Sequence, residues 1–452
     1  MFHAQTLADW LRFLEAQHPK GQAGIELGLE RVRQVLEAMG LASRLPFPVV
    51  TIGGTNGKGS SVAMLEAVLV AAGHRVGSYT SPHLQHYNER VHLDGQPATD
   101  EQLMRGFEQV EAARGAVPLT YFEFGTLAAL AVFVEAGIDV AILEVGLGGR
   151  LDAVNVIDAD AVLITNVALD HVEWLGADHE SIGREKAGIL RRNQWAVLAE
   201  SDPPHSVLEH ARSLGLRPWR RGYDFDIRRG QDGWAWIGHG GRYDLPMPAL
   251  AGGHQLDNAA GVVMLLEGLR EALPWTLDHL REGLRSVRHP GRLQCLMHGG
   301  VPVWIDVAHN PAGVEALAHA LAEHAWAGRT LAVFSALADK DAVGMARQLA
   351  DVVDAWYVAG LEGPRGRKAS ELAALLEQAG LPVAGAWTSP SMAYNAAWGD
   401  ARGALPSGGA TVTGCDGLQE ASDRAADRLL VFGSFLCVAD ILDHIHPSQP
   451  GA

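Results

Sequence analysis

A short β-branched run at residues 48–52 leads directly into a glycine-rich loop at 53–60, and an apolar helix is expected at 60–72. Strand, glycine loop and helix in this order are typical of a doubly wound α/β sheet. Glycines let backbone N–H groups converge on phosphate oxygens, and the helix N-terminus adds partial positive charge. Lys58 can place a charge on the β- and γ-phosphates, and Ser60 can offer a hydroxyl to Mg²⁺. The loop therefore predicts a nucleotide site, and a plain turn with a solvated lysine is the alternative.

The loop departs from the common phosphate-loop pattern G-x-x-x-x-G-K-[ST]. Gly53 lies one residue too close to Gly57, and Gly59 separates Lys58 from Ser60. This spacing disfavours an ordinary GTPase or kinase.

The alternation of strands and helices continues and predicts an α/β fold with two domains. The first, residues 1–290, is a mostly parallel sheet that carries the phosphate loop. Its expected helices are 6–16, 28–39, 60–72, 125–136, 258–271 and 277–287, its strands are 48–52, 140–145, 161–167 and 196–198, and an antiparallel meander is expected at 219–250. The second, residues 291–452, is a smaller Rossmann-like domain. Its expected strands are 301–305, 330–334, 355–359 and 429–432, its helices are 312–323, 342–349 and 370–377, a last helix follows Ser434, and 403–427 reads as a long loop.

The chain is acidic, with 36 lysine and arginine residues against 53 aspartate and glutamate residues and a formal net charge of −17. This balance argues against a protein that coats nucleic acid, which needs a basic face. An anionic substrate must then be held by local cations or metal, because the overall field repels it. The N-terminus does not resemble a signal peptide, and no apolar run reaches the roughly 18 residues of a membrane span. We therefore expect a cytoplasmic protein with neither nucleic acid nor membrane as a partner.

Further motifs lie on both sides of the loop. They are residues 25–31, Ser81-Pro82-His83-Leu84, Asn88-Glu89-Arg90-Val91, residues 122–126, residues 144–153, Leu169-Asp170-His171 and residues 183–189. Together with residues 54–60 they resemble the folylpolyglutamate synthase/dihydrofolate synthase family, in the bacterial bifunctional form. This family belongs to the Mur-ligase superfamily of ATP-dependent amide-forming ligases. The resemblance covers nearly the whole chain and implies a Mur-ligase-like fold.

The resemblance assigns the nucleotide and its metal to specific residues. The ATP-binding residues are Gly54, Thr55, Asn56, Gly57, Lys58, Gly59 and Ser60, with Asn258 at the adenine, Arg292 at a phosphate and Asp306 at a ribose hydroxyl. Ser81, Glu144 and His171 would hold one Mg²⁺, and Ser60 with Glu144 would help to hold a second. Glu144 ends a predicted strand and His171 follows another, and the carboxyl ends of strands face the ligand crevice in doubly wound sheets. Without the motif, His171 would be an ordinary surface or core histidine.

Lys186 matches a lysine that is carbamylated in the family, so that its terminal carboxylate binds metal. Carbamylation needs a neutral amine and therefore a pKa lowered by burial or nearby cations. The alternative is a surface lysine paired with Glu185 or Glu180.

The resemblance also assigns the acceptor and the incoming amino acid. Phe122, Asp152 and Ala153 would lie near the pterin, and His309 and Ser434 near the glutamate. The candidate catalytic residues are Lys58, His171, Lys186, Arg292 and His309. Structural alternatives exist for several positions: core packing for Phe122, a helix N-cap at Asp257 or Asn258, a solvated linker arginine at Arg292, and capping by Asn310 with Pro311 at the first helical position.

The implied reaction is ATP-dependent amide formation. The substrates would be dihydropteroate, tetrahydrofolates and L-glutamate, joined through an acyl phosphate in the cleft between the two domains of a monomer. One alternative is a Mur-type ligase, but the 52 residues before Gly53 are too few for the extra sugar-recognition domain of those enzymes. Another is a nucleotide-dependent switch without catalysis, which would not need the Glu144 and His171 pair.

Overall fold

The computed structural model describes residues 4–17, 26–323, 326–403 and 426–445. The chain forms two compact units, Met1–Ala249 with Gln255–Arg288, and Leu250–His254 with His289–Ala452. The second unit thus includes a short segment, Leu250–His254, that the sequence analysis placed in the first domain. No helix in the described part of the chain combines the length and the apolar character needed to cross a membrane.

The first unit is built on an eight-stranded sheet in the order β4-β3-β2-β5-β1-β6-β7-β8. Six strands run parallel, and β3 and β4 form an antiparallel edge. The strands are β1 Val49–Gly53, β2 Val76–Tyr79, β3 Val91–Leu93, β4 Gln96–Pro97, β5 Val140–Glu144, β6 Ala161–Ile164, β7 Trp195–Leu198 and β8 Trp219–Arg220. Since β1 lies between β5 and β6, the glycine loop that follows β1 opens beside the ends of both neighbours.

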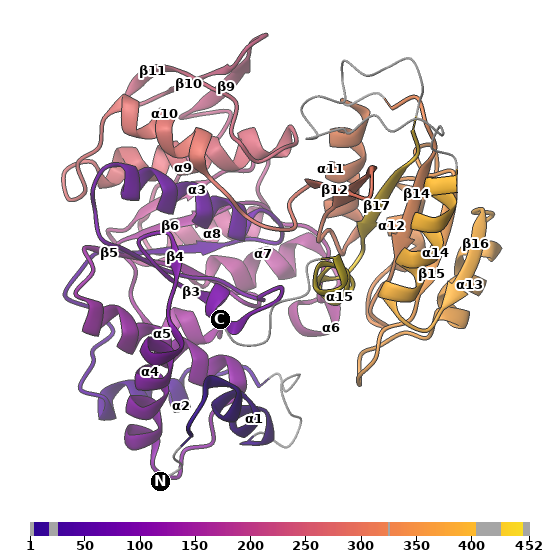
Figure 1. The fold of residues 1–452 in the computed structure, drawn as a ribbon. Coiled ribbons are helices and arrows are strands. Elements are labelled where there is room, and N and C mark those ends of the chain that lie inside the picture. Colours follow the sequence, from indigo (N-terminus) through magenta and orange to yellow (C-terminus); the bar gives the residue numbers. More distant parts are fainter. Residues whose placement is uncertain (1–3, 18–25, 324–325, 404–425, 446–452) are drawn as a thin grey trace. The chain divides into compact units, whose positions relative to one another are not determined.

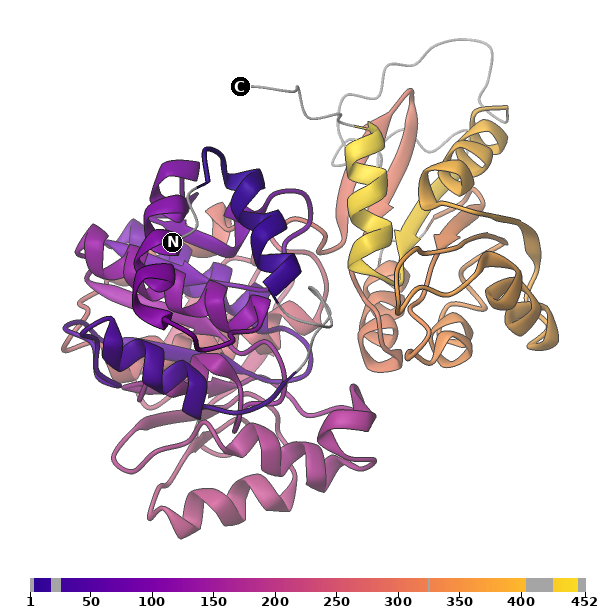
Figure 2. The ribbon, with the colours of Figure 1, turned by 90° about the horizontal axis from the view of Figure 1, so that it is seen from below.

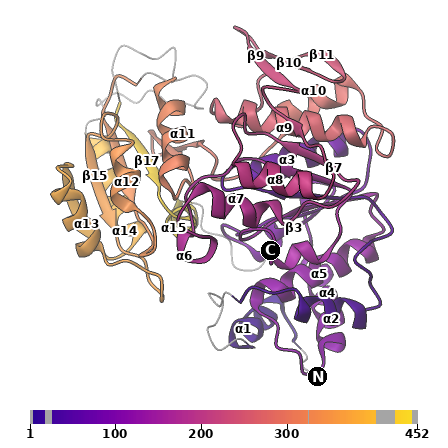
Figure 3. The ribbon, with the colours of Figure 1, turned by 180° about the vertical axis from the view of Figure 1, so that it is seen from behind.

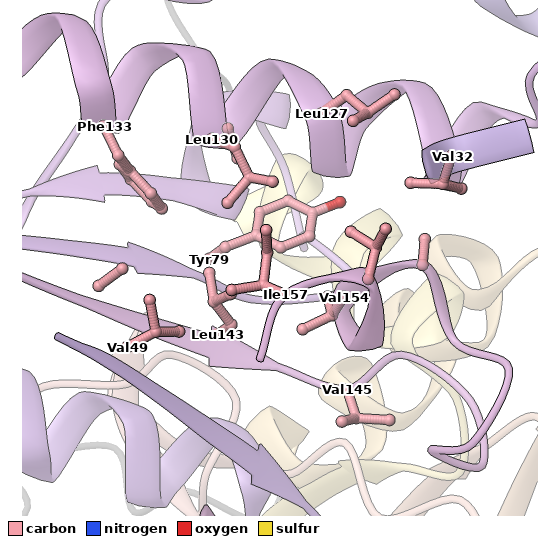
Figure 4. Packing of buried hydrophobic residues seen from close by; sticks show 14 of the residues in the cluster. Val32, Val49, Tyr79, Leu127, Leu130, Phe133, Leu143, Val145, Val154 and Ile157 are labelled. Carbon is pink, nitrogen blue, oxygen red and sulfur yellow. The ribbon is translucent and has the colours of Figure 1, made fainter. Parts of the chain in front are cut away.

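Helices cover both faces of this sheet. The first face carries α3 Lys58–Ala71, α9 His254–Leu269 and α10 Leu277–Ser286, and the second carries α1 Leu7–Gln17, α2 Glu30–Ala38, α4 Asp100–Arg114 and α5 Tyr121–Ala136 (Figures 1 and 2). The remaining elements are α6 Val172–Leu175, α7 His179–Ala187, α8 His205–Ser213 and the 3₁₀ turns η2 Tyr87–Arg90 and η3 Ala153–Val156. Figure 4 shows the core of the second face, where the Tyr79 ring lies between α5 leucines and the η3 segment.

The expected meander is present as a three-stranded antiparallel sheet in the order β11-β10-β9. Its strands are β9 Asp226–Arg229, β10 Trp234–Gly238 and β11 Gly241–Leu245. The expectation that it begins at residue 219 is wrong, because Trp219 and Arg220 pair with β7 in the main sheet. The Trp219 ring stacks on Trp195 at 4.9 Å between ring centroids, which favours this position.

The second unit has a six-stranded sheet in the order β12-β13-β17-β14-β15-β16, parallel except for β12. The strands are β12 Gln294–His298, β13 Val301–Ile305, β14 Thr330–Phe334, β15 Ala355–Ala359, β16 Val383–Trp387 and β17 Arg428–Phe432. The helices are α11 Pro311–Ala322, α12 Ala342–Arg347, α13 Ala369–Gln378, α14 Pro390–Gly403 and α15 Phe435–Ile445 (Figure 3). Most of the long loop expected at 403–427 lies outside the described residues.

Three helices begin two or more residues earlier than the sequence suggests. The helix expected from residue 60 begins at Lys58, that expected from 125 begins at Tyr121, and that expected from 258 begins at His254. Asp257 and Asn258 therefore lie inside α9, so the interpretation of either as its N-cap is wrong. The early starts bring Lys58 and Phe122 into the first turns of their helices.

Candidate active site

The glycine loop is fixed to the end of β6 by several hydrogen bonds. Asn166 accepts from the Thr55 N–H through its carbonyl and from the Asn56 N–H through its side chain, both at 2.9 Å. The Thr165 hydroxyl donates to the Asn56 carbonyl at 2.6 Å. Gly57 is the N-cap of α3 with φ +84°, a conformation that favours glycine. The loop is therefore a rigid turn whose helix N-terminus is available to an anion.

Lys58 and Ser60 lie where the loop enters the helix. The Lys58 ammonium donates to the carbonyls of Gly54 at 3.2 Å and Thr55 at 3.1 Å, so the charge lies over its own loop. Ser60 is buried, and its hydroxyl accepts from the Gln255 amide at 3.3 Å. A hydroxyl and an ammonium on one turn form the donor set that a magnesium-bound polyphosphate needs.

Asn258 packs directly against the glycine loop. A Cβ on Gly57 would lie 2.3 Å from Asn258 Oδ1, so only glycine fits there. Asn258 is buried, and its amide donates to Gln255 Oε1 at 3.0 Å. The pair Gln255 and Asn258 thus links α9 to the phosphate loop. Gln255 belongs to the same sequence motif as Asn258, but no role was predicted for it.

The carboxylate of Glu144 stands at the end of β5, next to β1. It is buried and accepts from the Ser81 N–H at 3.2 Å, which brings the segment after β2 against the same sheet edge. Carboxylate and hydroxyl oxygens suit Mg²⁺, which keeps several water ligands. Within the described residues no group of three or more His, Cys, Asp and Glu side chains could hold a metal. Glu144, Ser81 and Ser60 thus offer oxygens of the kind that Mg²⁺ prefers.

His171 caps the short helix α6 in the left-handed conformation, with φ +49°. Its N–H donates to Asp170 Oδ1 at 2.8 Å, and its Nε2 lies 3.9 Å from Asp170 Oδ2. A positive φ is uncommon outside glycine, although histidine is among the residues that adopt it most often, and such backbone positions cluster at functional sites. Asp170, which accepts from the backbone N–H of His171, lies in the quoted motif but was given no role there.

Lys186 is buried, in contrast to the surface lysine that was the alternative. Burial and the nearby charge of Lys58 lower the pKa of Lys186 to about 7, while Asp170 and Asp152 act in the opposite direction. Glu185, one suggested partner, instead pairs with Arg150 at 2.9 Å, and Glu180 accepts from the backbone of His205 and Ser206. An amine with this pKa is partly neutral at pH 7, which is what carbamylation needs.

Asp152 stabilises the loop that follows β5. It is fully buried and accepts from the N–H groups of Leu147 at 2.8 Å and Val154 at 3.0 Å. Burial raises the pKa of Asp152 to about 6, and these backbone donors and Lys58 oppose the rise. Ala153 follows in the η3 turn and is buried in the core cluster. Asp152 therefore has a structural role in addition to any contact with a ligand.

Phe122 lies half-buried on the first turn of α5 and packs against the core. A Cβ on Gly146 would meet its ring at 2.7 Å, and its ring centroid lies 5.9 Å from that of Tyr79. The alternative that Phe122 packs in the core is thus confirmed in part, because its half-buried side chain packs against the core cluster. Its place over Gly146 also puts it beside the loop that Asp152 supports.

In the second unit, Asp306 follows β13 and is held by two backbone donors, Leu293 at 2.8 Å and Ala308 at 2.7 Å. Burial raises the pKa of Asp306, and the guanidinium of Arg292 opposes the rise. Arg292 is half-buried, with its guanidinium 5.6 Å from the centroid of the Phe435 ring, so it is not a solvated linker residue.

His309 and Ser434 meet at the same edge of this sheet. His309 Nδ1 lies 2.9 Å from the Val307 carbonyl, and its ring packs on Phe435 at 5.7 Å. Ser434 is buried at the start of α15, where its hydroxyl accepts from the Leu436 N–H at 3.2 Å. Asn310 caps α11 by accepting from Gly313, with Pro311 at the first position, so the capping interpretation is confirmed. The second unit therefore gathers four of the predicted site residues around the end of β13 and the start of α15: Arg292, Asp306, His309 and Ser434.

Thr165 and Asn166, which shape the phosphate loop, were not predicted. Their signal was available, because they directly follow β6, the strand next to β1 in the sheet. Arg90 and His83 were quoted as motif residues without a role, and the structure joins them by a hydrogen bond of 2.7 Å.

Comparison with known proteins agrees with this arrangement. The family model of the Mur ligase middle domain matches residues 52–266, and that of the Mur ligase glutamate ligase domain matches 291–405. Fold and site together define a protein of the Mur-ligase class.

Relatives with this architecture cover the whole chain. The dihydrofolate synthase/folylpolyglutamate synthase of Escherichia coli (strain K12) is 41% identical over 449 residues, 99% of this chain and 97% of that protein. The structure of E. coli FolC in complex with DHPP and ADP has a TM-score of 0.85 at 41% identity and covers 98% of both chains. A bifunctional folylpolyglutamate synthase/dihydrofolate synthase with Mn, AMPPNP and L-glutamate bound has a TM-score of 0.82 at 41% identity, again over 98% of both chains. The chain belongs to the dihydrofolate synthase/folylpolyglutamate synthase family.

Proposed function

We propose that this protein joins L-glutamate to dihydropteroate, and further glutamates to tetrahydrofolates, with ATP as the energy source. The observation that carries the proposal is the phosphate loop with Lys58 above it, beside the buried carboxylate of Glu144 on the next strand. The relatives named above act on or bind these classes of ligand, which supports the same substrates here.

The first step is phosphoryl transfer between two anions, so positioning and charge neutralisation carry it. An oxygen of the acceptor carboxylate attacks the γ-phosphorus of ATP, the bond to the β-phosphate oxygen breaks, and ADP leaves. The N–H groups of residues 57–60 at the start of α3 and the Lys58 ammonium are proposed to hold the phosphates, and Arg292 to supply a second cation. Ser81, Glu144 and His171 would hold one Mg²⁺, and Ser60 with Glu144 would help to hold a second. Bound Mg²⁺ would screen the phosphate charge.

The second step forms the amide. The α-amine of glutamate attacks the acyl carbon, the carbon–oxygen bond to phosphate breaks, and the amine loses a proton as phosphate leaves. His309 and Ser434 are the proposed contacts of the incoming glutamate, and Asp306 that of the ribose. Phe122, Asp152 and Ala153 are the proposed contacts of the pterin, and Asn258 that of the adenine. We assign nucleotide binding to residues 1–290 and glutamate ligation to 291–452.

Lys186 is proposed to carry a carbamate that contributes an oxygen to a second Mg²⁺. Its burial, its lowered pKa and the absence of a hydrogen bond or ion pair to it from any described residue support this role. Lys186→Ala should lose activity that bicarbonate does not restore. Lys186→Cys, if alkylated to carry a carboxylate, should recover part of the activity. The protein is further proposed to act as a monomer in the cytoplasm.

The test is glutamate-dependent phosphate release from MgATP, with mass spectrometry of the products. Dihydropteroate and tetrahydrofolate are assayed separately, with Lys58→Ala as the inactive control. Turnover of both acceptors is the expected result. Failure of both acceptors with folded protein that binds ATP would refute the folate assignment and leave another amino-acid ligase as the function.

A further inference from the structure

Arg90 is a buried cation without an acidic partner. The residue is 7% exposed, and its guanidinium lies 5.5 Å from the ring centroids of both Tyr87 and Tyr121. No carboxylate of the described residues forms an ion pair with it. Cation–π contacts offset part of the desolvation cost, but a buried unpaired charge is kept only where another requirement holds it.

A hydrogen bond from this guanidinium to a histidine identifies that requirement. Arg90 Nε donates to His83 Nδ1 at 2.7 Å. Because arginine has donors and no acceptor, Nδ1 must present its lone pair and carry no proton. The neutral imidazole then has its proton on Nε2, a nitrogen that makes no hydrogen bond to any described residue. The bond thus selects one of the two tautomers of His83.

The segment between Thr80 and Arg90 is held firmly enough to keep this geometry. Glu89 accepts from three successive N–H groups, those of Leu84, Gln85 and His86, at 2.7 to 2.8 Å. The Thr80 N–H donates to the Arg90 carbonyl at 2.9 Å, which closes the segment at its base. Asn88 ties it to the Ala98 carbonyl at 2.8 Å.

The same segment carries the residue that reaches the sheet edge. Ser81 stands two positions before His83, and its N–H donates to Glu144. Tyr79, the last residue of β2, packs on Phe122, the proposed pterin contact (Figure 4 shows Tyr79). His83 is therefore attached to a rigid segment that begins between the metal-binding carboxylate and the acceptor side of the site.

We propose that Arg90 is a positioning residue that holds His83 in the Nε2-protonated tautomer, so that His83 acts as a hydrogen-bond donor to an oxygen of the acceptor's carboxylate. The proposal rests on the ligase function above. An acyl phosphate is a strong electrophile, and an imidazole with an open lone pair is a nucleophile that would compete with glutamate. In the selected tautomer Arg90 occupies the Nδ1 lone pair and Nε2 carries the proton. The ring can then orient the acyl group without attacking it.

The tautomer is measured directly on the full-length protein labelled with ¹⁵N in its histidine rings. The sequence has 20 histidines, and the His83 signal is assigned by its loss in His83→Gln. The expected spectrum has an unprotonated Nδ1 and a protonated Nε2. Arg90→Lys keeps the charge but lacks the Nε–H donor, so it should give a mixture of tautomers. A protonated Nδ1 in the wild type, or an unchanged spectrum in Arg90→Lys, would overturn the proposal whether or not the protein is a folate ligase.

Kinetics then test the consequence of the tautomer. Arg90→Lys should lower kcat/KM for the acceptor about tenfold, roughly one hydrogen bond at 1.4 kcal/mol per tenfold, and leave the KM for ATP unchanged. His83→Gln, whose amide can donate from near the Nε2 position, should retain more activity than His83→Ala. The matched control is Arg114→Lys, which alters a partly buried arginine paired with Glu111 on α4 and should not change acceptor kinetics. An equal loss of activity in His83→Gln and His83→Ala would contradict the proposal. So would an Arg90→Lys variant that changes the kinetic constants for ATP and for the acceptor equally, because Arg90 would then have only a structural role.

Discussion

The buried amine of Lys186 should make the free energy of unfolding of the first unit rise as pH increases above about 7. Its pKa is about 7 in the folded protein against 10.5 for a free side chain. Between these values the unfolded chain holds a proton that the folded chain does not, so the free energy of unfolding rises with pH. The rise is fully present above the unfolded pKa and is lost as pH falls to the folded pKa. At about 1.4 kcal/mol per pKa unit, the interval from pH 7 to 9 accounts for about 2 kcal/mol.

Lys186→Met removes this proton and fills nearly the same volume. Denaturant unfolding at pH 7, 8 and 9 in CO₂-free buffer should show wild-type stability rising relative to the variant by about 2 kcal/mol, with the variant the more stable at pH 7. Ligase activity should be lost. The matched control is Lys368→Met at an exposed lysine on the N-cap of α13, which should leave the pH dependence unchanged. Parallel pH profiles for wild type and Lys186→Met would refute the buried neutral amine.

Three further changes test other parts of the site. A carboxyl with a raised pKa destabilises the fold as it ionises, so wild-type stability should fall by up to about 3 kcal/mol between pH 4 and 6. Asp152→Asn should remove this fall, and the free energy of unfolding of the variant should change less across that pH range. Gly57→Ala should raise the KM for ATP at least tenfold, measured at saturating acceptor, because a Cβ at φ +84° is strained and meets Asn258. Gly146→Ala should displace the Phe122 ring and raise the KM for dihydropteroate while ADP affinity by calorimetry stays constant.

Those parts of the site that depend on local sequence were predicted well. The phosphate loop, the end of β5 at Glu144 and the capping of α11 by Asn310 each follow from a short pattern with one physical cause. Strands and glycine turns set these positions before any tertiary contact forms. The same reasoning predicted most parallel strands of both units, but it missed β2, Val76–Tyr79, which lies next to β5 inside the main sheet.

Features that depend on tertiary contacts were not accessible in this way. Helix α7, His179–Ala187, reads as polar, and only the packing of its Ile182 and Lys186 side decides that Lys186 is buried. Strand β16, Val383–Trp387, consists largely of small residues and has no clear strand pattern in the sequence. Its place in the sheet is set by pairing with β15. The start of α9 at His254 overrides the capping preference of Asp257, because helix position is set by packing as well as by capping residues.

The charges around Lys186 explain why burial is kept there at a cost in stability. Burial and the charge of Lys58 lower the pKa of Lys186, and burial raises the pKa of Asp152 to about 6 in the same environment. A fold selected for stability alone would replace such groups with apolar side chains of similar volume. A phosphate near Lys58 would offset its charge, and a carbamate would convert the amine of Lys186 into an anion. Each change would relieve the opposition between the two lysines, so ligand binding and stability should increase together in this unit.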